Sequence, residues 1–575
     1  MNPPEKRVVA QFFFANKKYR GHAAVAAAAC LIFCFSGCSM KGPANRIASV
    51  RFDFSGSARQ SFRIDDPAPV FQKIVFENTG SSPIRDFWLI VNNKDWSDDD
   101  GIADSIRAFN PNATTTHQKI MSLWAFMDHY FYYYTPALKN LDYHDAKFNL
   151  NIFGYGFCDD SAHMMEGLVV DYLGYLPQKH ARVVALDGHI VPEFYYDNQW
   201  HCPDANVAYF STPQKEALSV AELEGPFNSI ITTVFPGEYG KNLAEIYSTK
   251  NNNHYAKHNR KHTPPLRWTL LPGQRVEIHR TPPSSHYSHE YPDKPAPRLS
   301  GGVIVVQPIE YFPDGFDTVS NITKSDRSLR PAEASAPASV VTHVDTPYLF
   351  TGSTIEFSAT GPNPPDVIIS VSRDGKRWIQ LQAEQHSDSN RYRADAGRMT
   401  QMRRQLEYFR SLYIQLLWPA GSTTAVSDLK VTLEFQVATC SLPELIKGPN
   451  EIRIKSARPE SVLAEMQYFS PGYEPRPPTR IKWNSKNNLI TWKAPRRTDD
   501  LTGFRVTVSS DKSCLWPVQP LVLRKTVSRT TSKFTVNTSF LNPDRPYYFR
   551  VDSVYKIKGI ELLRPGPVHP LTLAP

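Results

Sequence analysis

The chain has 575 residues, of which 41% are hydrophobic and 12% aromatic, so it can build sizeable cores and lacks the composition of a disordered protein. Its formal net charge of +9 is spread along the whole length, without a basic stripe interleaved with aromatic residues, which argues against a nucleic-acid partner. The 47 prolines and many runs of Val, Thr, Tyr and Ile favour a β-rich chain of several domains.

Residues 1–37 are expected to be a signal peptide rather than part of the fold. A basic head precedes the apolar run "AAVAAAACLIFCF", which is too short to span a bilayer as a stable helix but suits a signal-peptide core. The following "FSGC" resembles the lipobox of bacterial lipoproteins, and this resemblance implies cleavage before Cys38 and lipidation of its thiol. Ser39 at the next position favours the outer membrane by the same resemblance. An ordinary secretory signal and an uncleaved anchor are the alternatives, and in each case the remaining chain is exported.

Residues 38–110 predict a small N-terminal β region, because short alternating runs such as "IASVRFDFSG" are separated by Gly, Ser and Pro. The spacing of the apolar residues changes at "NATTTHQKIMSLWAFMDHYFYYY", where they recur at helical spacing. We expect a helix here that begins at a capping threonine, Thr115 or Thr116, and ends near Pro136. A second helix is expected over residues 157–173. Strands should follow at "ARVVALDG" and "IVPEFYYDN".

The chain after these strands is predicted to be mainly β. Residues 261–324 are expected to form a β extension, and residues 325–339 have the Ser, Pro and Ala content of a linker. Residues 340–450 predict an all-β sandwich with a hairpin turn at Asp374-Gly375. The tail of this sandwich, "FQVATCSLPELIKGPNEIRI", resembles the discoidin-like or jelly-roll modules of some exported bacterial enzymes.

The last hundred residues carry a more specific pattern. Trp492 is expected in a core, and "LTGFRVTVSSD" has the alternation of a strand. The stretch "LNPDRPYYFRVDSV" places Leu541, Pro543 and Tyr547 at the spacing of a tyrosine corner. Residues 475–572 therefore resemble a fibronectin type III domain, a module that spaces or binds and carries no catalysis.

Four cysteines lie beyond the signal peptide and the anchor: Cys158, Cys202, Cys440 and Cys514. They have no CxxC spacing, so neither a metal site nor any cofactor is expected. Four cysteines spread over so long a chain cannot form a disulfide framework, which leaves a nucleophile as one use for a cysteine.

Cys158 has the setting of an activated thiol. An ordinary thiol has a pKa of about 8.5, and a helix N-terminus or an adjacent imidazolium lowers it. Cys158 should begin its helix directly after a glycine turn. His189 should begin a strand, a hairpin turn is expected at Asp197-Asn198, and Asp204 should lie on the returning strand as a diagonal neighbour of the histidine.

This arrangement resembles the transglutaminase-like superfamily, whose pattern is G-x-C-x-x-x-A, then H-x-x-x-E, then W-x-x-x-D. The resemblance places such a domain at residues 111–260. The matching residues are Gly156, Cys158 and Ala162 in the first motif, His189 and Glu193 in the second, and Trp200 and Asp204 in the third. It implies a papain-like α+β core in which Cys158 is the nucleophile, His189 the general base and acid, and Asp204 the orienting carboxylate.

Neighbouring residues leave alternatives open. Pro192 and Pro203 interrupt the strands of the motif and are tolerated best at positions that do not pair. A disulfide between Cys202 and Cys158 would silence the nucleophile. His163 is expected to pack within its helix rather than to act as the base.

Two classes of function follow. The first is a multidomain α+β and all-β enzyme, with a papain-like core plus jelly-roll-like and fibronectin type III-like β-sandwiches. It would be exported, lipid-anchored and monomeric, and would transfer an acyl group or hydrolyse an amide of a protein or peptide through a thioester on Cys158. The second is an inactive surface-anchored scaffold that binds a polysaccharide or a protein.

Overall fold

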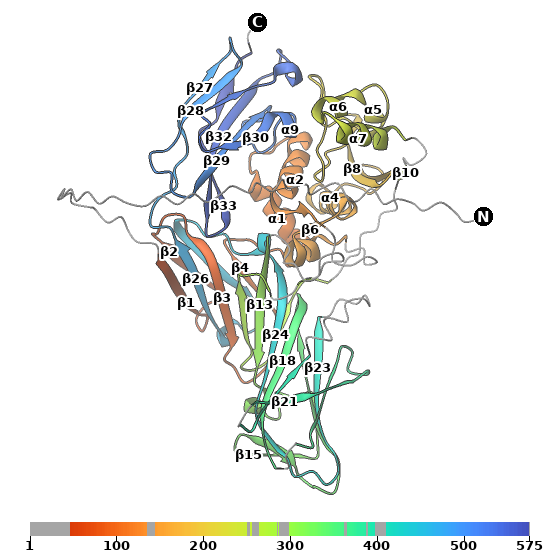
Figure 1. Ribbon diagram of the computed structural model, residues 1–575, viewed down its shortest axis with the longest axis vertical. Coiled ribbons are helices and arrows are strands. Elements are labelled where there is room, and N and C mark those ends of the chain that lie inside the picture. The colour runs from red at the N-terminus through yellow and green to blue at the C-terminus, as the bar shows by residue number, and fades with distance from the viewer. Residues whose placement is uncertain are drawn as a thin grey trace, which may run out of the picture. The chain divides into compact units, whose positions relative to one another are not determined.

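The computed structural model describes residues 46–134, 144–249, 254–255, 264–283, 286, 298–361, 365–386, 389–396 and 410–573. The described residues belong to one compact unit, and Cys38 and the expected signal peptide lie outside them. Strands outnumber helices (Figure 1). In the described part of the chain, every helix is too short or too polar to cross a membrane.

Most strands belong to three antiparallel sheets. The longest has the order β1 (Arg46–Asp53), β26 (Val462–Ser470), β3 (Val70–Asn78), β12 (Arg275–His279), β13 (Leu299–Val306), β24 (Ala425–Ala438), β18 (Leu349–Thr360), β22 (Arg391–Asp395), β21 (Ala383–Gln385), with β15 (Ile322–Ser325) and β16 (Ser328–Pro331) attached at β24. The second has the order β11 (Trp268–Leu270), β4 (Ile84–Val91), β25 (Gly448–Lys455), β2 (Arg59–Ile64). The third has the order β14 (Thr318–Ser320), β17 (Ala338–Asp345), β23 (Ser411–Trp418), β19 (Ile368–Ser372), β20 (Ile379–Leu381).

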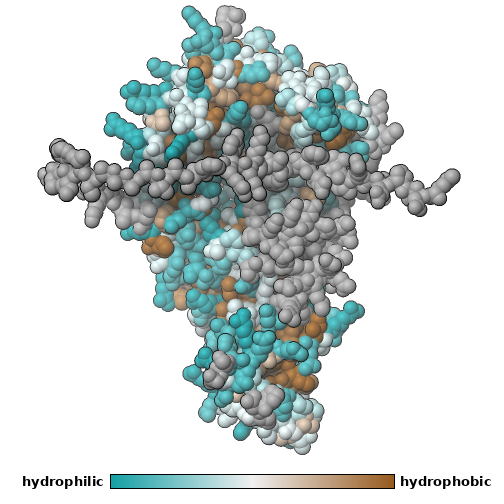
Figure 2. All heavy atoms as spheres, viewed as in Figure 1, coloured by the Kyte–Doolittle hydropathy of each residue, from teal (hydrophilic) through white to brown (hydrophobic). Residues whose placement is uncertain are grey.

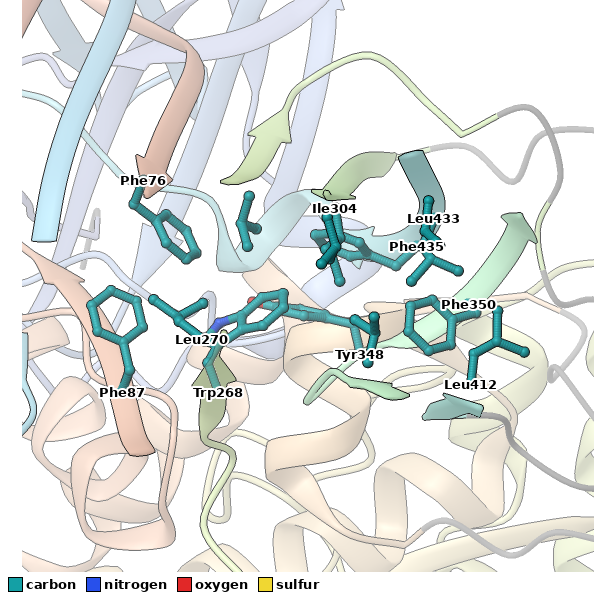
Figure 3. Close-up of a cluster of buried hydrophobic side chains, with 14 of the residues drawn as sticks. Phe76, Phe87, Trp268, Leu270, Ile304, Tyr348, Phe350, Leu412, Leu433 and Phe435 are labelled. Carbon is teal, nitrogen blue, oxygen red and sulfur yellow. The ribbon is translucent and has the colours of Figure 1, made fainter. Parts of the chain in front are cut away.

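These sheets share a core centred on Trp268 (Figure 3). The Trp268 ring lies 5.7 Å from that of Phe76, 5.6 Å from that of Tyr348 and 5.6 Å from that of Phe435, measured between ring centroids. The four rings come from β11, β3, β24 and the residue before β18. Such aromatic contacts add to the free energy of burial, so they hold strands that are far apart in sequence against one another.

The N-terminal β region is completed by strands from much later in the chain. β26 lies between β1 and β3, with Val50 opposite Met466 and Ile74 opposite the same methionine. The segment 325–339, expected to be a linker, contains β16 and the first residues of β17. Helix α1 (Asp99–Phe109), within the range expected to be β, begins after Asp98, whose carboxylate accepts the Gly101 N–H at 2.9 Å.

The helical part of the chain contains Cys158, His189 and Asp204. α2 (Thr116–Tyr130) begins with the expected cap, since the Thr115 hydroxyl accepts the Gln118 N–H. The Gln118 side-chain oxygen in turn accepts the Thr115 N–H. Its other elements are α3 (Ala146–Phe148), a π-helical turn (Asn149–Phe153), α4 (Cys158–Leu173), α5 (Val220–Glu224), α6 (Ser229–Val234) and α7 (Glu238–Ser248). Beside them lies a sheet of order β10 (His254–Tyr255), β7 (Ala181–Leu186), β8 (His189–Tyr196), β9 (Gln199–His201).

The C-terminal strands form two facing sheets. One contains β27 (Thr479–Asn484), β28 (Leu489–Lys493) and β31 (Lys533–Thr535), and the other contains β30 (Arg524–Ser528), β29 (Leu501–Ser509), β32 (Tyr547–Ile557), β33 (Ile560–Arg564) and β34 (His569–Leu571). Trp492 is buried, with its ring 5.4 Å from that of Phe504. The Tyr547 hydroxyl accepts the N–H of Asn542 at 2.7 Å, which is the tyrosine corner that the sequence indicated. The short helices α9 (Pro520–Leu523), Pro308–Tyr311, Thr439–Ser441, Pro459–Ser461 and Thr538–Phe540 complete the described helical elements.

This C-terminal sandwich packs against the helical part. Trp516 is fully buried in the same hydrophobic cluster as α1, α2 and α4. Arg524 forms an ion pair with Asp128 of α2 at 2.6 Å, and Gln118 donates to Asp511 at 2.8 Å. The sandwich is therefore joined to the helices by a buried apolar contact as well as by polar ones.

Replacing Tyr547 with Phe should destabilise the C-terminal sandwich by about 1–2 kcal/mol, because the Asn542 N–H loses its acceptor while the ring and its packing remain. Urea denaturation followed by tryptophan fluorescence measures this change. Tyr548→Phe is the matched control on the same strand and should leave the unfolding midpoint within error. Equal effects of the two substitutions would contradict the role of the corner.

Candidate active site

The backbone before Cys158 is shaped by two glycines. The π-helical turn Asn149–Phe153 ends at Gly154, which adopts the left-handed conformation with φ of 67°. β6 (Tyr155–Gly156) then pairs in parallel with β5 (Tyr132–Tyr133). A Cβ atom at position 156 would lie 2.8 Å from the Phe131 ring and would also meet the Asp160 carboxylate, so this position requires glycine.

Cys158 is the first residue of α4, as the sequence predicted. The Phe157 N–H donates to the Asp160 carboxylate at 3.0 Å, which caps the helix and holds its first turn. Cys158 is partly exposed. The positive end of the helix dipole favours a negative charge at this position.

His189 and Asp204 meet. Their hairpin turns at Asp197 and Asn198, both with positive φ, as expected for a two-residue turn. The His189 Nε2 atom lies 2.9 Å from Asp204 Oδ2. Asp204 is not on the returning strand, however, because β9 ends at His201. Pro203 has no N–H with which to extend the pairing, so the aspartate reaches the histidine from an extended segment beyond the strand.

Asp204 is held by two further hydrogen bonds. Its Oδ1 atom accepts the Asn206 N–H at 2.8 Å, and its backbone carbonyl accepts the indole N–H of Trp124, on α2, at 2.9 Å. The aspartate is only 1% exposed. Its carboxylate is therefore held in one position opposite the imidazole, as an orienting group requires.

The environment of His189 favours its protonated form. Burial disfavours the charge, but the carboxylate of Asp204, its hydrogen bond to the ring and the neighbouring Cys158 thiol outweigh burial and raise the pKa of His189 to about 10. The contribution of Cys158 places the thiol next to the imidazole. Because Nε2 faces Asp204, Nδ1 is the ring nitrogen left for the thiol.

Glu193 and Trp200, two further residues of the motif, support the strands around the pair. Glu193 is fully buried, and it accepts two hydrogen bonds from Arg182, at 2.9 and 2.6 Å, and one from the Val220 N–H at 2.7 Å. The Arg182 guanidinium lies 3.7 Å from the centre of the Trp200 ring. Together these contacts join β7, β8, β9 and α5 around one buried ion pair.

The remaining candidates are accounted for. Cys202 is a buried free thiol, and Cys158, Cys440 and Cys514 are free as well. His163 is buried and stacks on His144, with ring centroids 4.0 Å apart, and no pattern in the sequence identified this partner. Among the described residues, no group of three or more His, Cys, Asp or Glu side chains is arranged to hold a metal ion.

A cavity of about 750 Å³ lies apart from these residues. It is bordered by the end of β4, by α1 and α2, by Glu444 from the loop before β25, and by Arg453 and Lys455 of β25. Its walls combine aromatic rings, among them Trp96 and Tyr130, with acidic and basic side chains. None of Cys158, His189 and Asp204 lines it.

Comparison with known proteins identifies one part of the chain. Residues 474–562 match the fibronectin type III domain, so the C-terminal sandwich belongs to that family. No curated protein sequence matches the chain significantly. One similar solved structure is a β-1,2-glucanase from Parabacteroides distasonis, with 10% sequence identity and a TM-score of 0.13. The match covers 56% of this chain and 35% of the glucanase, and at this TM-score it supports no conclusion about fold or activity.

Glu193→Ala should destabilise the helical part by roughly 3–5 kcal/mol, because it leaves the Arg182 guanidinium without its buried carboxylate. Thermal unfolding followed by circular dichroism measures the loss as a lowered midpoint. Glu245→Ala, on an exposed position of α7, is the control and should change the midpoint little. A loss no larger than that of the control would show that the ion pair does not support the fold.

Asp204→Asn should lower the pKa of His189 well below about 10, since burial then disfavours the charged ring without the opposing carboxylate charge. Nuclear magnetic resonance of ¹³C-labelled histidine rings measures this titration, and Asp197→Asn in the exposed turn is the control. Since the folded-state pKa lies above the ordinary value of 6.5, the protonated ring stabilises the fold fully below pH 6.5. That contribution is lost as the pH rises through 10. A wild-type His189 that titrates near 6.5 would contradict the ion pair.

Proposed function

We propose that this protein is an exported cysteine-dependent acyl transferase or amide hydrolase of the transglutaminase-like superfamily, with residues 111–260 as its papain-like domain. The observation that supports the proposal most directly is the buried His189–Asp204 pair beside Cys158 at the start of α4. The three residue types, their order and their environments suit nucleophilic catalysis by a thiolate.

In the first half of the proposed reaction, the Cys158 thiolate attacks the carbonyl carbon of an amide. The C–N bond then breaks, and the His189 imidazolium gives its proton to the departing amine through Nδ1. The product on the enzyme is a thioester, and the imidazole is now neutral. Asp204 keeps Nε2 engaged, so the ring stays oriented through the change of charge.

In the second half, water or a second amine attacks the thioester carbonyl while His189 takes up its proton. The C–S bond breaks and the thiolate of Cys158 returns beside the imidazolium. Water gives a carboxylic acid and an amine gives a new amide, so the same residues serve hydrolysis and transfer. The acceptor that reaches the thioester decides between the two products.

The substrate in this proposal is a protein or peptide in the cell envelope, reached by a monomer anchored through a lipid on Cys38, in the outer membrane. The lipobox-like "FSGC" and the preceding apolar run support this location. The fibronectin type III domain packs on α2 through Arg524 and Asp128, so it would be positioned close to the proposed catalytic domain.

A second candidate function is an inactive scaffold that binds a polysaccharide. The cavity beside α1 supports it, because aromatic rings next to carboxylates and cations suit the faces and hydroxyl groups of sugars. In a scaffold of this kind the thiol of Cys158 would have no use as a nucleophile, so its reactivity separates the two candidates.

Iodoacetamide should alkylate Cys158 rapidly between about pH 6 and 7, because the imidazolium of His189 favours the thiolate there. His189→Ala should slow this labelling about tenfold or more and shift its pH dependence towards that of a free thiol. Mass spectrometry of the Cys158 peptide follows the rate. His180→Ala is the control, since this partly exposed histidine lies outside the motif.

Slow labelling that the His189 substitution does not change would exclude the enzyme and favour the polysaccharide scaffold. Rapid, His189-dependent labelling would justify a search for amide substrates.

A further inference from the structure

The C-terminal sandwich holds the segment that follows the aspartate of the candidate site. The side chain of Gln519 accepts the Ser211 N–H at 2.9 Å and donates to the Tyr209 carbonyl at 3.0 Å. The Ser211 hydroxyl donates to the Val518 carbonyl at 2.7 Å, and the Tyr209 hydroxyl donates to the Pro517 carbonyl. These hydrogen bonds join the sandwich to a stretch of chain that begins five residues beyond the aspartate.

Both sides of this contact are fixed within their own parts of the molecule. On the sandwich side, the Val518 N–H donates to the Val508 carbonyl of β29 at 2.9 Å. On the other side, the Phe210 carbonyl accepts the Leu218 N–H at 2.8 Å, and the Leu218 carbonyl accepts the Cys202 N–H at 3.2 Å. Cys202 is two residues before the aspartate. The aspartate therefore lies between two anchored points of the chain.

A second contact reaches Asp204 through Trp124 on α2. The indole N–H of Trp124 donates to the Asp204 carbonyl. The centre of the indole ring lies 4.9 Å from the ring centre of Tyr209 and 5.6 Å from the guanidinium carbon of Arg524. Arg524, at the start of β30, also forms the ion pair with Asp128, one helical turn after Trp124. Arg524 thus binds the turn of α2 from which the indole holds Asp204.

The residues at this contact are withdrawn from water. Tyr209, Trp516 and Gln519 are fully buried, although Gln519 is polar. On the face drawn in Figure 2, in contrast, apolar residues form small patches among hydrophilic ones. A buried amide whose oxygen and nitrogen both bind backbone groups is costly to displace, so Gln519 fixes one arrangement of the two segments.

We infer that Gln519 and Arg524 of the fibronectin type III domain are positioning residues of the candidate active site. They hold the segment after Asp204 and the indole of Trp124, so the carboxylate stays opposite His189. The inference rests on the proposed function and adds part of a second domain to its active site. Both residues act through Asp204.

The titration of His189 tests the inference on the full chain. Arg524→Ala and Gln519→Ala should each lower the pKa of His189 from about 10 by roughly 0.4–1.5 pH units, because a displaced carboxylate stabilises the imidazolium less. The sign of the change is diagnostic. Loss of the Arg524 charge acting directly through space would raise this pKa, since it removes a positive charge. Nuclear magnetic resonance of ¹³C-labelled histidine rings measures the titration.

Arg497→Ala is the matched control. Arg497 also pairs with an aspartate, Asp499 at 2.7 Å, and its guanidinium carbon lies 4.2 Å from the centre of the Tyr473 ring. Because these partners belong to the C-terminal part of the chain, the substitution should leave the pKa of His189 unchanged. Arg524→Ala removes a partly exposed ion pair and should stay folded, so it decides the outcome if Gln519→Ala unfolds.

His343 provides an internal reference in the same spectra. Hydrogen bonds to Asp317 and Asp345 raise the pKa of His343 to about 10 as well. His343 lies on β17 in the third sheet, so its titration should be alike in the wild type and in every variant.

Trp124→Phe shows whether Arg524 acts through the indole. The phenyl ring keeps an aromatic face but has no N–H for the Asp204 carbonyl, so this substitution should lower the pKa of His189 by itself. In this background Arg524→Ala should lower the pKa of His189 little further, because the link through which it acts is already broken. Additive effects of the two substitutions would overturn the role of Arg524.

The outcomes for the two proposals differ. A His189 pKa near 10 that Arg524→Ala and Gln519→Ala leave unchanged or raise overturns the inference. Rapid, His189-dependent labelling of Cys158 by iodoacetamide then leaves the proposed function standing. Slow labelling with the pH profile of a free thiol overturns the proposed function, and the titration still decides whether the sandwich positions the His189–Asp204 pair.

Discussion

The buried carboxylate of Asp204 is the group on which the candidate site depends. It stabilises the positive charge of His189, which burial alone would disfavour. Its backbone carbonyl binds the Trp124 indole, so the same residue joins the hairpin to α2. One aspartate thereby sets both the position and the protonation of the imidazole.

The site is supported by a second buried ion pair that takes no part in the proposed chemistry. Glu193 and Arg182 join adjacent strands, and Trp200 covers the guanidinium. Buried pairs of this kind add little net stability over apolar residues, but they are strongly destabilising to break, so they fix the register of the strands that contain them. Register matters here because His189 lies only four residues from Glu193 on β8.

The sequence predicted the local elements well where local signals were strong. Thr115 and Gln118 form the capping box of α2, Asp197 and Asn198 form the hairpin turn, and Cys158 begins α4. In each case the responsible atoms lie within a few residues of one another, so spacing and residue type suffice. The fibronectin type III domain was predictable for a similar reason, because its tyrosine corner is a contact over five residues.

Other features could not be predicted, because they depend on contacts between distant segments. β26 pairs with β1 and β3 across about four hundred residues, and no pattern within one strand identifies its partner at that distance. Asp204 was expected on a strand, but pairing stops at His201, and the aspartate reaches His189 from beyond the strand. α1 has a capping aspartate and buried Ile102 and Ile106, a signal that surrounding strand-like runs obscured.

The sequence by itself therefore determined the types of the site residues, their order and the turns and caps that present them. Only the tertiary structure decided that His189 and Asp204 are buried together and that the carboxylate raises the pKa of the imidazole. The physical reason is that caps and turns are local hydrogen bonds. Burial and electrostatic interactions, in contrast, depend on which groups the whole fold brings within a few ångströms of one another.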